Sequence, residues 1–214
     1  MSEATPIVFV VDDEPAVVVA LARMLQSSGF TVSPHTSAVE FLAAHAADVP
    51  GCLVADVHMP GMNGLELQRA LLARGIDRAI VFVTGQGDIP TTVQAMKAGA
   101  VTFLSKPVQR AELVAAVREA LARDAAGRSH HREREDLVRR LASLTPRERQ
   151  VLDLVATGML NKQIAAELGA AEKTIKVHRG RIMEKMQVRT ATALVGLLSR
   201  AELPADLTRG SPAP

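Results

Sequence analysis

The stretch Val54-Ala55-Asp56-Val57-His58-Met59-Pro60-Gly61-Met62-Asn63-Gly64 decides the fold. In it a single carboxylate, Asp56, ends an apolar run and is followed at once by turn residues. An apolar run of this length predicts a buried β-strand, and the residues after it predict a turn. Open α/β sheets bind their ligands at the carboxyl ends of their strands, so Asp56 is the first candidate site residue.

Other polar side chains follow apolar runs in the same way. They are Asp12 and Asp13, Thr84, and Lys106, which come after the runs 7–11, 79–83 and 101–104. If the four runs are parallel strands of one sheet, all five side chains gather at one edge. Three acids, a hydroxyl and a lysine at one edge suit a Mg²⁺ ion and a phosphoryl group. The alternative is that these acids only cap the helices that follow them. This alternative could explain one acid alone, but it does not explain why all five polar residues occupy strand ends.

Short apolar runs alternate with helical patterns over residues 5–121. The predicted strands lie near 7–11, 30–34, 51–55, 79–83 and 101–104, and the predicted helices near 15–28, 37–46, 64–73, 89–98 and from 109 onward. Strands separated by helices indicate βαβ units and a parallel sheet. Because the runs 7–11 and 79–83 are apolar throughout, we expect both faces of the sheet to be covered. The predicted fold class is α/β, with a doubly wound five-stranded parallel sheet.

The composition excludes several classes of protein. The chain has 214 residues and is 48% hydrophobic, which is enough for one large domain or two small ones. No apolar run approaches the roughly 18 residues that a membrane span needs, and the amino terminus lacks the basic region of a signal peptide. The single cysteine, Cys52, excludes an internal disulfide and fits a reducing compartment. We therefore expect a cytoplasmic protein without a membrane partner.

The charge differs between the two halves of the chain. Residues 1–123 carry 9 Lys and Arg against 12 Asp and Glu, whereas residues 143–203 carry 10 against 6. An acidic first half and a basic second half indicate two tasks, and the second is consistent with nucleic-acid binding. Between them, residues 123–136 hold many charges and no large apolar side chain, which predicts a solvated helix or a linker.

A second unit begins at Leu144. Thr145 is a suitable N-cap, Pro146 takes the first helical position and Glu148 completes a capping box. Helical patterns follow near 146–156, 161–168, 172–186 and 190–200. We therefore expect a first domain at 5–121, a helical linker at 122–142, an all-α four-helix domain at 143–203, and a disordered tail at 204–214.

The motifs of the first domain are VVDDEP, VADVHMPGMNGLEL and FVTGQGDIPTTVQAMKAGAVTFLSKP. With them, residues 5–121 resemble the receiver domain of bacterial response regulators, which is a flavodoxin-like fold. The resemblance implies that Asp56 is the phospho-acceptor and that Asp12 and Asp13 form the acid pocket. It also implies that the main-chain carbonyl of His58 is a further ligand of Mg²⁺.

The same resemblance assigns roles to residues of the last two strands. Thr84 and Phe103 match the paired switch residues, and Lys106 matches the lysine of the site. The peptide bond before Pro107 is cis in this family. Phosphorylation should draw Thr84 inward and let Phe103 follow, which changes the surface near 89–104 that the family uses for receiver dimers.

The motifs of the second domain are LTPRERQVL, GMLNKQIAAELG and EKTIKVHRGRIMEKM. They resemble the helix-turn-helix DNA-binding domain of the LuxR/NarL/FixJ group, and the two domains together are most similar to FixJ/StyR-type regulators. The resemblance makes 172–186 the recognition helix, and its implied DNA contacts fall into two sets. Lys176, Val177 and Gly180 would face base edges, and Lys162, Thr174 and Arg179 would contact phosphates.

Two positions of the recognition helix stay open at this point. Gly180 stands where relatives carry a longer side chain, so it either allows close approach to DNA or loses a contact. His178 lies near the apolar stripe of Ile175 and Ile182, which favours packing over base reading.

Three functions remain to be compared. The leading hypothesis is a two-component response regulator, phosphorylated on Asp56 by a sensor histidine kinase, that then dimerises and binds DNA to regulate transcription. The second is a Mg²⁺-dependent phosphatase or mutase, but such enzymes usually carry an acid two residues after the nucleophile, where this chain has His58. The third is a DNA-binding protein that does not depend on phosphorylation. We expect that the chain is not an enzyme.

Overall fold

The computed structural model describes residues 5–44, 49–85 and 89–200. Internal contacts divide the chain into two compact units, one that reaches to Ser129 and one that starts at His130, and each is described by itself. No helix within the described ranges is both long and apolar enough to cross a membrane. The predicted tail at 204–214 lies outside the described residues.

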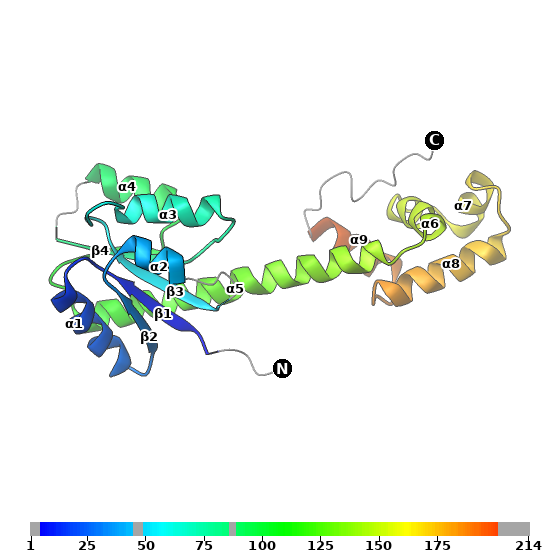
Figure 1. The fold of residues 1–214 in the computed structure, drawn as a ribbon. Coiled ribbons are helices and arrows are strands. Elements are labelled where there is room, and N and C mark those ends of the chain that lie inside the picture. Colours follow the sequence, from blue (N-terminus) through cyan, green and yellow to red (C-terminus); the bar gives the residue numbers. More distant parts are fainter. Residues whose placement is uncertain (1–4, 45–48, 86–88, 201–214) are drawn as a thin grey trace. The chain divides into compact units, whose positions relative to one another are not determined.

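A parallel β-sheet forms the centre of the first unit (Figure 1). Its described strands are β1 (Ile7–Val11), β2 (Thr31–His35), β3 (Gly51–Asp56), β4 (Ile80–Thr84) and β5 (Thr102–Ser105). They are ordered β2-β1-β3-β4-β5, and every neighbouring pair is parallel. The register places Val11 beside Ala55 and Asp56 beside Val83, so the carboxyl ends of these strands meet at one edge.

Helices cover both faces of this sheet. They are α1 (Pro15–Gln26), α2 (Ala38–Ala44), α3 (Gly64–Ala73), α4 (Ile89–Lys97) and the first part of α5 (Arg110–Ala142). The helices α1 and α5 pack with Val8, Val10 and Val54, whereas α2, α3 and α4 pack with Phe9, Leu53 and Phe82 on the other face. The predicted α/β fold with a doubly wound parallel sheet is therefore confirmed.

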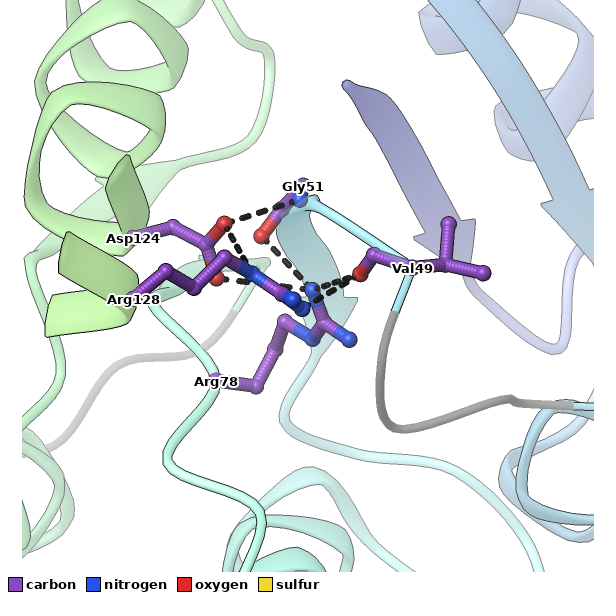
Figure 2. Close-up of polar contacts among 5 residues, drawn as sticks. All are labelled: Val49, Gly51, Arg78, Asp124 and Arg128. Atoms are coloured by element: carbon purple, nitrogen blue, oxygen red, sulfur yellow. Dashed lines mark hydrogen bonds and ion pairs between the residues drawn. The ribbon is translucent and has the colours of Figure 1, made fainter. Parts of the chain in front are cut away.

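The segment 123–136 differs from its prediction. It lies within the helix α5, and Asp124 in it is buried and accepts a hydrogen bond from the main-chain nitrogen of Gly51 (Figure 2). The interpretation of this whole segment as a solvated helix or linker is therefore wrong for its first part. It failed because two partners of Asp124, Gly51 and Arg78, lie far away in the sequence, so the local pattern of charged and apolar residues gives no sign of them.

The described part of the second unit contains four further helices. They are α6 (Pro146–Ala156), α7 (Asn161–Glu167), α8 (Glu172–Lys185) and α9 (Ala191–Arg200). Their core is aliphatic and includes Val151, Ile164, Ile175 and Ile182, together with Leu137 from the end of α5. The helix-turn-helix pair α7 and α8 is thus held by apolar contacts on one side, which leaves the other side of α8 exposed.

A cluster of polar side chains stabilises the start of α6. Thr145 and Glu148 form the predicted capping box, which satisfies main-chain N–H groups at the start of α6. The Glu148 side chain is only 3% exposed and accepts a hydrogen bond from Lys185 Nζ at 2.7 Å. The Lys185 hydrogen bond, followed by the main-chain N–H of Thr145, holds the pKa of the Glu148 carboxyl below its ordinary value near 4.5.

We predict that Glu148→Gln lowers the stability of the second unit by about 1.5–3 kcal/mol, because a buried charge-assisted hydrogen bond is lost. Since the pKa of Glu148 is lower in the folded chain than in the unfolded chain, its stabilising effect is complete above about pH 4.5 and disappears as the pH falls further. The variant should therefore lose less stability than wild type on acidification. Urea unfolding followed by circular dichroism measures both effects, since the chain has no Trp or Tyr.

The matched control is Glu167→Gln, which makes the same change at an exposed position of the same unit. Equal urea midpoints for Glu148→Gln, Glu167→Gln and wild type at neutral pH would show that the buried hydrogen bond contributes nothing.

Candidate functional site

Strand ends bring the predicted receiver residues together. Asp56 and Thr84 are the last residues of β3 and β4, Asp12 follows β1, and Lys106 follows β5. Because the strands are parallel neighbours, these side chains share the carboxyl edge of the sheet. The structure thus places these four side chains at the edge where the sequence predicts them.

Three carboxylates form the acidic part of this edge. Asp12, Asp13 and Asp56 each offer an oxygen within 4.8 Å of the others. Asp12 and Asp56 are buried, whereas Asp13 is exposed. Carboxylate oxygens gathered at this spacing, with one of them open to solvent, are a donor set that fits a Mg²⁺ ion, which prefers a few carboxylates and retains several waters.

Lys106 bridges two of the acids. Its Nζ donates to Asp12 Oδ2 at 2.7 Å and to Asp56 Oδ2 at 3.0 Å. Burial by itself lowers the pKa of Lys106, but the hydrogen bonds and charges of Asp12 and Asp56 outweigh burial, so this pKa lies above its usual value. The ammonium group is therefore charged at neutral pH and stands directly beside the candidate phospho-acceptor.

The loop after Asp56 is held in a tight turn. Asn63 caps α3 in a reciprocal pair with Glu66, and the main-chain nitrogen of Gly64 donates to the carbonyl of Val57. A Cβ atom on Gly64 would collide with the carbonyl oxygen of Asp56, so only glycine fits. This packing fixes the backbone on the carboxyl side of Asp56, including His58.

Thr84 contacts the imidazole ring of His58, for which the sequence predicted no role. Its Oγ1 lies 3.2 Å from Nδ1 of His58, within hydrogen-bonding distance. From the sequence, a role was predicted only for the main-chain carbonyl of His58, because no spacing rule shows where the imidazole ring points.

Phe103 is half-buried, and the centroid of its ring lies 5.8 Å from that of Phe82. The peptide bond between Lys106 and Pro107 is cis, as the resemblance implies.

The helix α8, which the sequence predicts to be the recognition helix, exposes most of its predicted DNA contacts. Ile175 and Ile182 face the core of the second unit. At the helical repeat of about 100° per residue, Lys176, Val177 and Gly180 fall on the opposite side of α8, and all three are exposed. An added Cβ on Gly180 meets no atom within 4 Å, so nothing inside the protein requires glycine there.

The three predicted phosphate contacts are placed differently from one another. Lys162 on α7 and Thr174 on α8 are exposed. Arg179 is half-buried, and its Nη1 lies 3.5 Å from the carbonyl oxygen of Met159. Arg179 is thus partly engaged within the protein, whereas the other two side chains are open to a ligand.

Comparison with protein families matches both units. Residues 8–118 match the response regulator receiver domain, and residues 142–198 match the bacterial regulatory proteins of the luxR family. The chain is 44% identical to the transcriptional regulatory protein FixJ of Azorhizobium caulinodans over 96% of this chain and 98% of that protein. It is 45% identical to nodulation protein W of Bradyrhizobium diazoefficiens over 94% of this chain and 89% of that protein.

Solved structures agree with these matches. The response regulator StyR covers 92% of this chain and all of its own length, with 47% identity and a TM-score of 0.84. Full-length FixJ from B. japonicum covers 92% of this chain and 98% of its own length, with 38% identity and a TM-score of 0.57. These similarities extend over both units rather than over the receiver alone.

Proposed function

Because the chain belongs to the two-component response regulators with a receiver and a LuxR-type DNA-binding domain, we propose that phosphorylation of Asp56 controls its binding to DNA. This family consists of transcription regulators and not of enzymes, so the phosphatase or mutase hypothesis is set aside. The observation that carries the proposal is the position of Lys106, whose ammonium group holds the carboxylates of Asp12 and Asp56 at one edge of the sheet.

The chemistry follows from the polar groups at this edge. A carboxylate oxygen of Asp56 attacks the phosphorus atom of a phosphohistidine on a sensor histidine kinase. The phosphorus–nitrogen bond of the donor breaks, and an acyl phosphate forms on Asp56. Lys106 then pairs as a point charge with the new phosphoryl oxygens, and this charge-assisted contact replaces its present hydrogen bond to Asp56.

A divalent cation suits the same edge. Asp12, Asp13, Asp56 and the main-chain carbonyl of His58 are the groups that would hold Mg²⁺. When bound, the ion supplies positive charge that offsets the repulsion among the carboxylates and the incoming phosphoryl group. The close approach of the three carboxylates supports this assignment.

The switch would begin at Thr84. Its hydroxyl moves toward the phosphoryl group and gives up its contact with His58, and Phe103 follows into the space that Thr84 leaves. The surface that changes with them carries exposed apolar side chains on α4, namely Val93 and Met96, each 44% exposed. Apolar side chains on an exposed helix suit a contact with a second receiver, so we infer a homodimer of the phosphorylated protein.

Dimerisation brings two α8 helices to one DNA site. Joined receivers raise the effective concentration of the second DNA-binding unit once the first has bound. Lys176, Val177 and Gly180 would read base edges in the major groove, while Lys162, Thr174 and Arg179 set the register on phosphates. A DNA target and a kinase donor are both consistent with a cytoplasmic protein.

We predict that Asp56→Asn abolishes labelling by a small phosphodonor such as acetyl phosphate in the presence of Mg²⁺. The amide is a poor nucleophile and a poor ligand for a hard cation. Asp77→Asn, the same change at an exposed loop position, should be labelled like wild type. Stoichiometric labelling of the Asp56 variant would show that another residue accepts the phosphoryl group.

We predict that Thr84→Ala is still labelled but dimerises less on phosphorylation, because the hydroxyl that responds to the phosphoryl group is gone. Sedimentation velocity of labelled and unlabelled protein measures the effect. Thr31→Ala, on the exposed edge strand β2, serves as the control. A Thr84 variant that dimerises like the control would exclude Thr84 from the switch.

We predict that Lys162→Ala weakens DNA binding and flattens its salt dependence. One neutralised phosphate contributes about one unit to the slope of log K against log salt, so each monomer should lose about one unit. Filter-binding titrations at several salt concentrations measure this slope. The control is Arg23→Ala, which removes an exposed cation from α1, away from α4, and equal slopes for the two variants would remove Lys162 from the DNA contacts.

A further inference from the structure

The middle of α5 contains a buried charged residue, Asp124, in a stretch without buried apolar side chains. The structure describes every residue from 121 to 136, and among them Asp124 alone is buried. The apolar residues of α5 that reach a core lie on either side, at Leu113 to Ala120 and at Leu137 and Leu141. Whatever holds the helix to the first unit beyond Leu121 must therefore act through polar contacts.

Those contacts form one network at the start of β3 (Figure 2). Asp124 Oδ2 accepts hydrogen bonds from the main-chain nitrogen of Gly51 at 3.0 Å and from Nε of Arg128 at 2.9 Å. Nη1 of Arg78 lies 3.5 Å from Asp124 Oδ1 and donates at 2.9 Å to the carbonyl oxygens of both Val49 and Gly51. Arg128 Nη2 donates to the carbonyl of Val49 at 2.6 Å. Helix α5 is thus bonded to the chain before β3 and to the chain before β4.

Burial makes these contacts strong and specific. The side chains of Arg78 and Asp124 are 1% and 6% exposed, and that of Arg128 is 22% exposed. The carboxylate of Asp124 lies between the guanidinium groups of Arg78 and Arg128. Both guanidinium groups also donate hydrogen bonds to main-chain carbonyl oxygens. Removing the carboxylate would leave two buried or half-buried cations beside each other, which is the arrangement that proteins tolerate least.

The main chain that receives the network is itself fixed. Gly51 has a φ of +149°, and a Cβ atom there would collide with the carbonyl oxygen of Ile7 in β1. The guanidinium carbon of Arg78 lies 5.5 Å from the centroid of the Phe9 ring, also in β1. The helix is therefore attached to the first residue of β3 and, through Arg78, to a side chain that packs on β1.

The network stands at the amino edge of the same strands that carry the proposed switch. β3 begins at Gly51 and ends at Asp56, and β4 begins two residues after Arg78 and ends at Thr84. We propose that Arg78, Asp124 and Arg128 form an anchor that makes α5 part of the receiver as far as Arg128. The anchor holds the part of α5 that precedes the second unit, and it thereby couples the state of the receiver to the DNA-binding domain. The coupling part rests on the proposed function, whereas the anchoring part does not.

The test compares three variants in the full chain. Asp124→Asn removes the buried charge, and Arg128→Gln is the milder change, since it leaves Arg78 and Asp124 in contact. Asp136→Asn is the matched control, because this aspartate lies on the same helix but, among the residues that the structure describes, pairs only with Arg139 and Arg140 within one turn. Amide hydrogen exchange of residues 122–129 is measured without phosphodonor, and affinity for a DNA duplex selected from a random pool by phosphorylated wild type is measured before and after labelling with acetyl phosphate.

We expect the amides of 122–129 to exchange at least about tenfold faster in both test variants than in Asp136→Asn. Labelling should stay normal, while the gain in DNA affinity on phosphorylation should fall by at least about fivefold. Exchange equal to that of the control in both variants would overturn the anchor. Faster exchange with an unchanged gain in affinity would overturn the coupling. A wild-type protein that shows no gain at all would contradict the proposed function, and with it the coupling, whereas the exchange rates would still decide the anchor.

Discussion

The carboxylates of Asp12, Asp13 and Asp56 repel one another at the carboxyl edge of the sheet, and the single ammonium group of Lys106 offsets part of that repulsion. Two like charges about 4 Å apart cost on the order of 4 kcal/mol near a protein surface. With Lys106 included, about two negative charges remain, which is what a divalent cation would neutralise. In the proposed function, a change in the charge of this edge, such as an added phosphoryl group, would redistribute the contacts of Lys106 and Thr84.

The two edges of the sheet have different polar chemistry. At the carboxyl edge, the described acids outnumber the cation of Lys106, and the contacts of Lys106 and Thr84 are those that phosphorylation would rearrange. At the amino edge, the two cations of Arg78 and Arg128 share the one carboxylate of Asp124, and they also donate hydrogen bonds to main-chain carbonyl oxygens. The first arrangement suits an exchange of partners, and the second suits a permanent attachment. The strands β3 and β4 run from one edge to the other, so the fold joins the reactive site to the point where α5 is held.

Regular local patterns explain what could be predicted from the sequence. Apolar runs without alternation predicted the parallel sheet, and polar residues at their ends predicted that Asp12, Asp56, Thr84 and Lys106 share one edge. Contacts between distant residues account for what was missed. Asp124 bonds to Gly51, 73 residues away, and the His58 ring contacts Thr84, 26 residues away. The burial of Asp124 has no local signal in the sequence, because Gly51 and Arg78, which enclose its carboxylate, are far away along the chain.

The central claim is that the receiver controls the DNA-binding domain. The most direct measurement is the dissociation constant of the wild-type protein for a selected DNA duplex, determined at one salt concentration before and after stoichiometric phosphorylation. The account predicts that phosphorylation tightens binding by at least about tenfold, because paired receivers present two α8 helices together. Equal dissociation constants for the two forms would contradict it, and they would instead indicate a DNA-binding protein whose receiver does not regulate affinity.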